Sequence, residues 1–117
     1  MLMSSEIEII VDEPKQGLLI VTVKGQYCLE TLELIEHHLS GAFSTNPHTL
    51  AINCSETTYI DSTGLGSLVK FYNASLKGNV KFILVDLNKE ILRIIEIAGL
   101  VKFFDIQTRE QFGENYL

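Results

Sequence analysis

Residues 60–66 combine residue types that could hold an anion at the start of a helix. Asp61, Ser62, Thr63 and Gly64 stand between an apolar strand candidate and a regular helical pattern. A helix N-terminus leaves backbone N–H groups unpaired and carries the positive end of the helix dipole, so it stabilises negative charge. A phosphate on Ser62 would fit there and would add about −1.5 to −2 charges at pH 7. Beside Asp61, that charge could turn an attractive contact with a partner into a repulsive one.

The same residues also have a simpler interpretation. Asp61 or Ser62 can serve as the N-cap of the helix, and capping serines are common enough that the physics alone favours this interpretation. Gly64 and Gly66 would remove side chains that could crowd a phosphate or a partner. A phosphate-binding P-loop is a poorer interpretation, because the Gly-Lys-[Ser/Thr] ending is missing and Lys70 lies too far along the helix.

No other group of residues suggests catalysis or a cofactor. Cys28 and Cys54 are far apart in the sequence, with no thiol or histidine at ligand spacing. His37 and His38 are adjacent and would point to different faces of a helix, while His48 stands in a loop. The sequence therefore predicts neither an enzyme nor a metal site, and no cofactor.

Alternating strands and helices are predicted to position this segment. The expected fold class is α/β, in the order ββαβαβαβα, with a hairpin followed by strands that alternate with helices. Such alternation requires right-handed crossovers, which give a mostly parallel sheet of about five strands with helices mainly on one face. The predicted strands are 7–11, 18–23, 49–54, 80–85 and 103–106, and the predicted helices are 29–43, 65–76, 89–98 and one that begins at Thr108.

Two of the predicted helices carry informative apolar patterns. The helix after Ser62 has the most regular stripe, and Gly78 with Asn79 should end it. The helix at 89–98 is apolar on more than one side. Core filling explains most of that pattern, and a dimer face or a groove for a partner would explain the surplus. The stripe of the helix after Ser62 consists of Leu65, Leu68, Val69, Tyr72 and Leu76.

Length, composition and charge limit the classes of protein to which the chain could belong. A chain of 117 residues has room for one domain, 1–117. Its 46% apolar and 21% charged residues are typical of a globular protein. No apolar run approaches the roughly 20 residues that cross a bilayer, and the N-terminus lacks a targeting leader, so we expect a cytoplasmic protein without membrane contact. The net charge of −6 argues against nucleic-acid binding and favours a protein or small-molecule partner.

Two motifs resemble those of the STAS family, the sulfate-transporter and anti-sigma-factor-antagonist domain, and specifically its small bacterial antagonists. Residues 59–66, YIDSTGLG, match the family's pattern of an aromatic and an apolar residue followed by Asp-Ser-[Ser/Thr]-Gly-Leu-Gly. Residues 94–104, IIEIAGLVKFF, resemble its apolar helix, Gly-Leu turn and closing strand. The resemblance covers residues 7 to about 112 and implies the STAS fold.

The resemblance also implies a mechanism. In such antagonists, an anti-sigma factor that is also a serine kinase phosphorylates the serine after the aspartate, which here is Ser62, with Thr63 as the second candidate. The unphosphorylated antagonist binds the anti-sigma factor and frees the sigma factor for transcription. The phosphorylated form lets go, and a metal-dependent serine phosphatase restores binding. Asp61 would help to orient the hydroxyl in the kinase site. The other residues implied in the partner surface are Gly64, Leu65 and Ser67.

The residues after Gly25 depart from the family pattern. Cys28 stands where many antagonists have an aspartate at the entrance of the first helix, and it is either a buried inert cysteine or a redox-sensitive thiol. Tyr27 is either an exposed aromatic anchor for a partner or a packed tyrosine. We include both among the candidate partner-binding residues. The departure at Cys28 leaves a second hypothesis open: a STAS ligand sensor or scaffold that is not phosphorylated, with nucleotide binding at the Ser62 helix N-terminus as one form. We expect a monomer or a weak homodimer.

Overall fold

The computed structural model of the chain describes residues 6–117. Residues 1–5, on which the expected absence of a targeting leader depends, lie outside the described residues. The elements are β1 (Ile7–Lys15), β2 (Leu18–Tyr27), the 3-10 turn η1 (Leu29–Thr31), α1 (Leu32–Phe43), β3 (Thr49–Asn53), β4 (Thr57–Ile60), α2 (Ser62–Gly78), β5 (Lys81–Val85), α3 (Lys89–Ile97), β6 (Asp105–Gln107) and α4 (Arg109–Tyr116).

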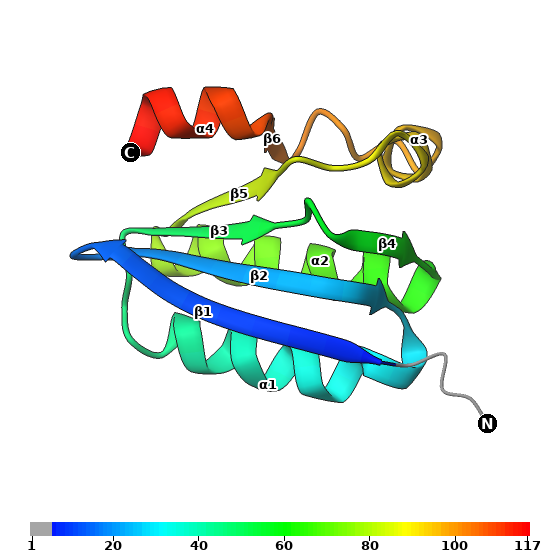
Figure 1. The fold of residues 1–117 in the computed structure, drawn as a ribbon, viewed down its shortest axis with the longest axis horizontal. Helices are drawn as coiled ribbons and strands as arrows, with labels where there is room; N and C mark the ends of the chain where they lie inside the picture. Colours follow the sequence, from blue (N-terminus) through cyan, green and yellow to red (C-terminus); the bar gives the residue numbers. More distant parts are fainter. Residues whose placement is uncertain (1–5) are drawn as a thin grey trace.

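The sheet is mixed, as Figure 1 shows, with one antiparallel edge on an otherwise parallel set of strands. Its order is β1-β2-β3-β5-β6, and β4 pairs with the last part of β2. The first pair is a hairpin in which Ile9 lies opposite Val23. Because β2, β3, β5 and β6 follow one another in the same direction across the sheet, right-handed crossovers place the connecting helices on the same face.

That face carries the main core. Helices α1 and α2 lie against it (Figure 1), and two buried isoleucines, Ile91 and Ile95, attach α3 to the same apolar cluster. Fully buried strand residues such as Val21, Ile52 and Leu84 supply the sheet side of the core. The predicted α/β class, mostly parallel sheet and dominant helical face are therefore confirmed.

Helix α4 packs on the opposite face of the sheet, above β5 in Figure 1. Thr108 and Gln111 form a capping box that begins the helix, as the sequence predicted for Thr108. Phe112 then enters a second apolar cluster with Leu18 and Ile83. Within residues 6–117, no helix combines the length and the apolar character needed to span a membrane.

Three details differ from the sequence-based expectation. The last strand covers Asp105–Gln107 rather than 103–106, because Phe103 belongs to a turn that lets the chain re-enter the sheet. An additional short strand, β4, extends the sheet beside Tyr27. Leu76 is exposed although the apolar stripe of α2 includes it. Small residues occupy part of the buried face of α2, and a pattern based on large apolar residues does not detect them. The buried residues of this helix are Gly64, Ser67, Leu68, Phe71 and Ser75.

Replacing Phe112 tests the attachment of α4. Phe112→Ala should lower the free energy of unfolding by about 3 kcal/mol, because a buried aromatic ring leaves a cavity when it is truncated. Urea denaturation followed by circular dichroism measures the change. Tyr116→Ala is the matched control and should cost only about 1 kcal/mol, since Tyr116 stacks on Phe112 but is only partly buried. Equal losses for the two variants would contradict the role given to Phe112.

Candidate functional site

Asp61 connects two helix N-termini at the junction between β4 and α2. It is the N-cap residue of α2, and its Oδ1 accepts a hydrogen bond from the backbone N–H of Gly64 at 2.8 Å. Its Oδ2 accepts another from the backbone N–H of Leu29, in η1, at 3.1 Å. One carboxylate thus satisfies unpaired backbone donors of two helical segments and holds the β2–α1 loop against the start of α2.

Ser62 is the first residue of α2, and its side chain is exposed. The next residue, Thr63, is half-buried, so its hydroxyl is less accessible to an enzyme. The Ser62 hydroxyl stands at the positive end of a 17-residue helix, where added negative charge is favoured by the dipole and opposed by the neighbouring Asp61. The structure therefore leaves Ser62 accessible for modification within a rigid capping motif.

Gly64 allows α2 to approach β2 closely. A Cβ atom at this position would collide with the backbone carbonyl oxygen of Tyr27 and would also come within 2.9 Å of the Ile60 side chain. The backbone N–H of Asp61 donates to the same Tyr27 carbonyl at 3.3 Å. The sequence-based reason for Gly64, room for a phosphate or partner, is therefore wrong. At Gly66, in contrast, a Cβ atom would meet open space, as expected if this glycine leaves room for a phosphate or a partner.

A hydrogen-bond network behind the junction runs from the buried Tyr27 to the exposed Lys70. The Tyr27 hydroxyl is 2.7 Å from Ser67 Oγ, which donates to Glu36 Oε2 at 2.7 Å. Lys70 Nζ completes the network at 2.9 Å from Glu36 Oε1. Burial raises the pKa of Tyr27 well above its usual range, so the phenol stays protonated. The hydrogen bond from Lys70 lowers the pKa of the Glu36 carboxyl and keeps it ionised. The network joins β2, α1 and α2 behind Ser62.

Tyr27 and Cys28 do not form the exposed surface that one interpretation of the sequence assigned to them. Tyr27 is only 1% exposed and bonds to Ser67, which is itself buried, so the exposed-anchor interpretation is wrong. The Cys28 thiol is also buried and lies 3.2 Å from Glu30 Oε1. Tyr27, Cys28 and Ser67 are therefore buried beneath the exposed residues of the junction instead of being part of a partner surface. Gly64 is buried as well.

Cys28 occupies the N-cap position of η1, where its backbone N–H donates to Thr31 Oγ1 at 3.1 Å in a capping box and its side chain carries no charge. The N–H of Leu29, the first residue of the turn, is instead bonded to Asp61. An aspartate at position 28 could cap the turn itself. In this chain Asp61 supplies the negative charge for both helical segments, which explains how the turn keeps its position with Cys28 in place of an acid.

Two exposed apolar side chains flank Ser62, and the sequence-based list of partner residues omitted both. Leu29 is 64% exposed and Tyr59 is 48% exposed. Leu29 lies beside Asp61 through its backbone hydrogen bond, and Tyr59 precedes Asp61 by two residues at the end of β4. Tyr59 was visible as the aromatic residue of the motif, whereas Leu29 falls outside every apolar stripe. We call Leu29, Tyr59, Ser62 and Gly66 the junction surface.

The described residues 6–117 contain no cluster of histidine, cysteine, aspartate or glutamate side chains able to hold a metal ion. The chemistry of the junction is that of a carboxylate cap, an exposed hydroxyl and apolar flanks. Such a surface can be contacted by a protein, and its exposed hydroxyl can be covalently modified.

The sequence profile described as the STAS domain matches residues 10–113. The chain belongs to the STAS family. The anti-sigma-B factor antagonists of Listeria monocytogenes and Listeria innocua are each 33% identical to it over 61 residues. That match covers 52% of this chain and 54% of each antagonist, so it spans about half the length of these curated relatives.

Solved structures support the same fold. An anti-sigma factor antagonist from Mycobacterium paratuberculosis superposes with a TM-score of 0.78 at 25% identity, over 87% of this STAS domain and 86% of that chain. The antagonist SpoIIAA in its unphosphorylated form gives a TM-score of 0.76 at 16% identity, over 92% and 95%. The Bacillus cell fate determinant SpoIIAA in its phosphorylated form gives 0.72 at 16% identity, over 94% and 100%. Both forms of SpoIIAA thus have the fold of this STAS domain.

The buried hydrogen bond between Tyr27 and Ser67 can be tested by removing one hydroxyl at a time. Ser67→Ala should lower the free energy of unfolding by about 2 kcal/mol, because it leaves the Tyr27 phenol buried without its partner. In the double variant Ser67→Ala/Tyr27→Phe, the loss should be smaller than the sum of the single losses by at least about 0.5 kcal/mol. Denaturant unfolding of the four proteins measures the coupling. Strictly additive losses would show that the two hydroxyls do not interact.

Proposed function

We propose that this STAS domain is an anti-sigma factor antagonist whose contact with an anti-sigma factor is switched by phosphorylation of Ser62. The observation that carries the proposal is the exposed Ser62 hydroxyl at the first position of α2, next to the Asp61 cap. The antagonist names of the Listeria and Mycobacterium relatives agree with it. The proposed partners are an anti-sigma factor with serine-kinase activity and a metal-dependent serine phosphatase, and the regulated process is sigma-factor-dependent transcription.

The junction surface gives the switch a physical basis. In the unphosphorylated form, Leu29 and Tyr59 offer exposed apolar area close to the junction that carries the small neutral hydroxyl of Ser62. Such apolar anchors around a small polar group favour a close protein contact. A phosphate at Ser62 would add about two negative charges beside Asp61. Burying these charges costs several kcal/mol unless the partner pairs them, so the phosphorylated surface would release the anti-sigma factor.

The Asp61 carboxylate bears on the competing hypothesis of a nucleotide sensor. A ligand phosphate at the N-terminus of α2 would need backbone donors of the first turn, and the Gly64 N–H is already bonded to Asp61. It would also meet the negative charge of that carboxylate. A covalent phosphate on Ser62 needs no such binding energy. The geometry therefore favours modification of Ser62 over reversible binding of a nucleotide.

Phosphorylation of Ser62 is the direct test. We expect the purified protein to gain one phosphate when it is incubated with ATP and an anti-sigma factor kinase from the same cell, and peptide mass spectrometry should place it on Ser62. Ser62→Ala should abolish the modification and keep the anti-sigma complex intact in the presence of ATP. Thr63→Ala is the matched control and should still be modified. A phosphate found only on Thr63, or none with a kinase that is active on another substrate, would contradict the proposed switch.

The apolar flanks can be tested separately from the phosphate. Leu29→Ala and Tyr59→Ala should each weaken binding of the anti-sigma factor about tenfold or more, because each removes exposed apolar area next to Ser62. Isothermal titration calorimetry without ATP measures the affinity. Leu76→Ala removes an equally exposed side chain at the far end of α2 and should leave the affinity unchanged. An affinity that depends on Leu76 and not on Leu29 or Tyr59 would place the contact elsewhere.

A further inference from the structure

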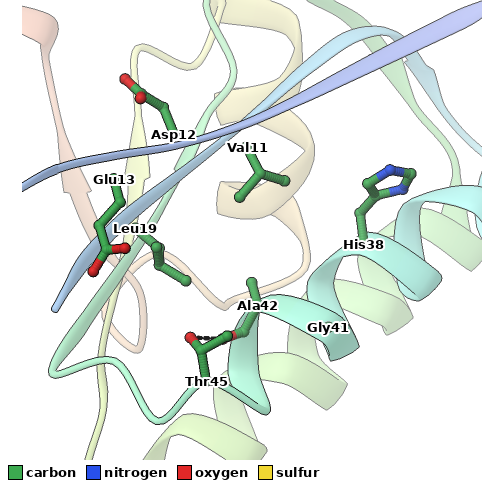
Figure 2. A pocket seen from close by; sticks show the side chains of 8 residues that line it. All are labelled: Val11, Asp12, Glu13, Leu19, His38, Gly41, Ala42 and Thr45. Atoms are coloured by element: carbon green, nitrogen blue, oxygen red, sulfur yellow. Dashed lines mark hydrogen bonds between the residues drawn. The ribbon is translucent and has the colours of Figure 1, made fainter.

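A groove of about 450 Å³ lies between β1 and α1, and its size is in the range of ligand sites. Figure 2 shows the side chains of Val11, Leu19 and Ala42 directed into the space between the strand and the helix. The groove borders the hairpin turn between β1 and β2 and the end of α1, whereas β4, which leads into the start of α2, lies at the opposite end of the sheet (Figure 1). The remaining lining residues are Asp12, Glu13, His38, Gly41 and Thr45.

Two features of the described chain leave the groove open. Val11 is 46% exposed although Val21, opposite it in the hairpin, is fully buried. Gly41 stands inside α1, where glycine weakens a helix relative to alanine. A Cβ atom at Gly41 would meet no atom within 4 Å, so internal packing does not require the glycine. Both residues keep the groove open, and an occupant would account for both.

The polar groups around the groove are mainly hydrogen-bond acceptors. His38 Nδ1 lies 3.0 Å from the Leu34 carbonyl oxygen, and since a carbonyl only accepts, Nδ1 must carry the proton. In the neutral imidazole Nε2 is then an acceptor. Glu13 uses one carboxylate oxygen to accept from the Gly17 N–H, which leaves the other oxygen for a ligand. Asp12 adds a second carboxylate nearby, which Figure 2 shows directed away from the groove, on the other face of β1. An occupant that fits this rim supplies donors and positive charge.

The free edge of the sheet lies next to the groove. β1 is the outermost strand, and within residues 6–117 only β2 pairs with it. An added strand could therefore use the outer backbone groups of β1, and its alternate side chains would face opposite sides of the sheet. One set would enter the groove beside Val11. The other set would face Asp12 and Glu8, on the other side of β1.

We propose that the groove between β1 and α1 binds an extended segment of a partner protein in which apolar residues alternate with lysine or arginine. The apolar residues fill the space over Leu19 and Ala42, and the basic residues meet the carboxylates of Glu8 and Asp12. A second copy of this chain fits less well, because pairing two β1 strands would bring their acidic residues together. This binding surface is separate from Ser62 and does not depend on the switch.

The test uses a fluorescein-labelled octapeptide in which valine alternates with arginine, and a second octapeptide with glutamate in place of arginine. Fluorescence anisotropy should show binding of the arginine peptide and none of the glutamate peptide. In ¹H–¹⁵N spectra of the full chain, the arginine peptide should shift the amide signals of Val11 and Gly41 and leave that of Ser62 unchanged. Equal binding of the two peptides, or shifts confined to Ser62 and its neighbours, would overturn the proposal.

Two variants of the chain make the test specific. Gly41→Leu fills the groove with a better helix-forming residue, so it should weaken binding of the arginine peptide about tenfold or more without lowering the melting temperature. Ser40→Leu is the matched control, because Ser40 is exposed on the same helix but does not line the groove. Asp12→Lys should weaken binding of the arginine peptide and allow the glutamate peptide to bind. Unchanged binding in Gly41→Leu, or a concentration-dependent dimer that only Gly41→Leu abolishes, would overturn the proposal.

Discussion

The hydrogen bonds of the Asp61 carboxylate are the constraint on which the candidate site depends. One oxygen caps α2 and the other caps η1, so a single side chain fixes the start of two helical segments that are distant in sequence. This arrangement places Leu29 beside Ser62 and closes the end of the sheet where β4 extends β2. Because each carboxylate oxygen accepts a backbone hydrogen bond, Asp61 holds the junction in a defined geometry, and the Ser62 residue beside it is exposed.

The close packing of α2 on the sheet makes this cap possible. Gly64 lets the first turn of the helix approach the Tyr27 carbonyl, and Ser67, one turn later, replaces an apolar contact by a hydrogen bond to the Tyr27 phenol. Glu36 extends the connection to α1. Small and polar residues thus occupy positions where larger apolar side chains would hold the helix further from the sheet. A rigid base of this kind lets the exposed residues of the junction keep a defined geometry.

Much of this arrangement could be predicted from the sequence, and the exceptions have common physical causes. The β-branched strands, the capping signals at Asp61 and Thr108, and the glycines at the ends of α2 and α3 define the order of the elements and the position of Ser62. The buried face of α2 was assigned in part: most of the predicted stripe packs on the core, but the stripe included the exposed Leu76 and missed the buried Ser67 and Ser75, which do not count as apolar. The burial of Tyr27 and the contact between Leu29 and Asp61 depend on residues more than 30 positions apart, which no local pattern reports.

The two ends of the sheet have different chemistry, and this limits how the proposed switch can act. The Ser62 end is held by a carboxylate, a buried phenol and closely packed backbone, so a phosphate there would change the charge of the surface more readily than the fold. At the other end, the Val11 and Gly41 region is open and loosely filled, so occupancy there need not disturb the Asp61 cap. A partner held at the β1 edge could therefore stay attached while the contact at Ser62 forms and breaks.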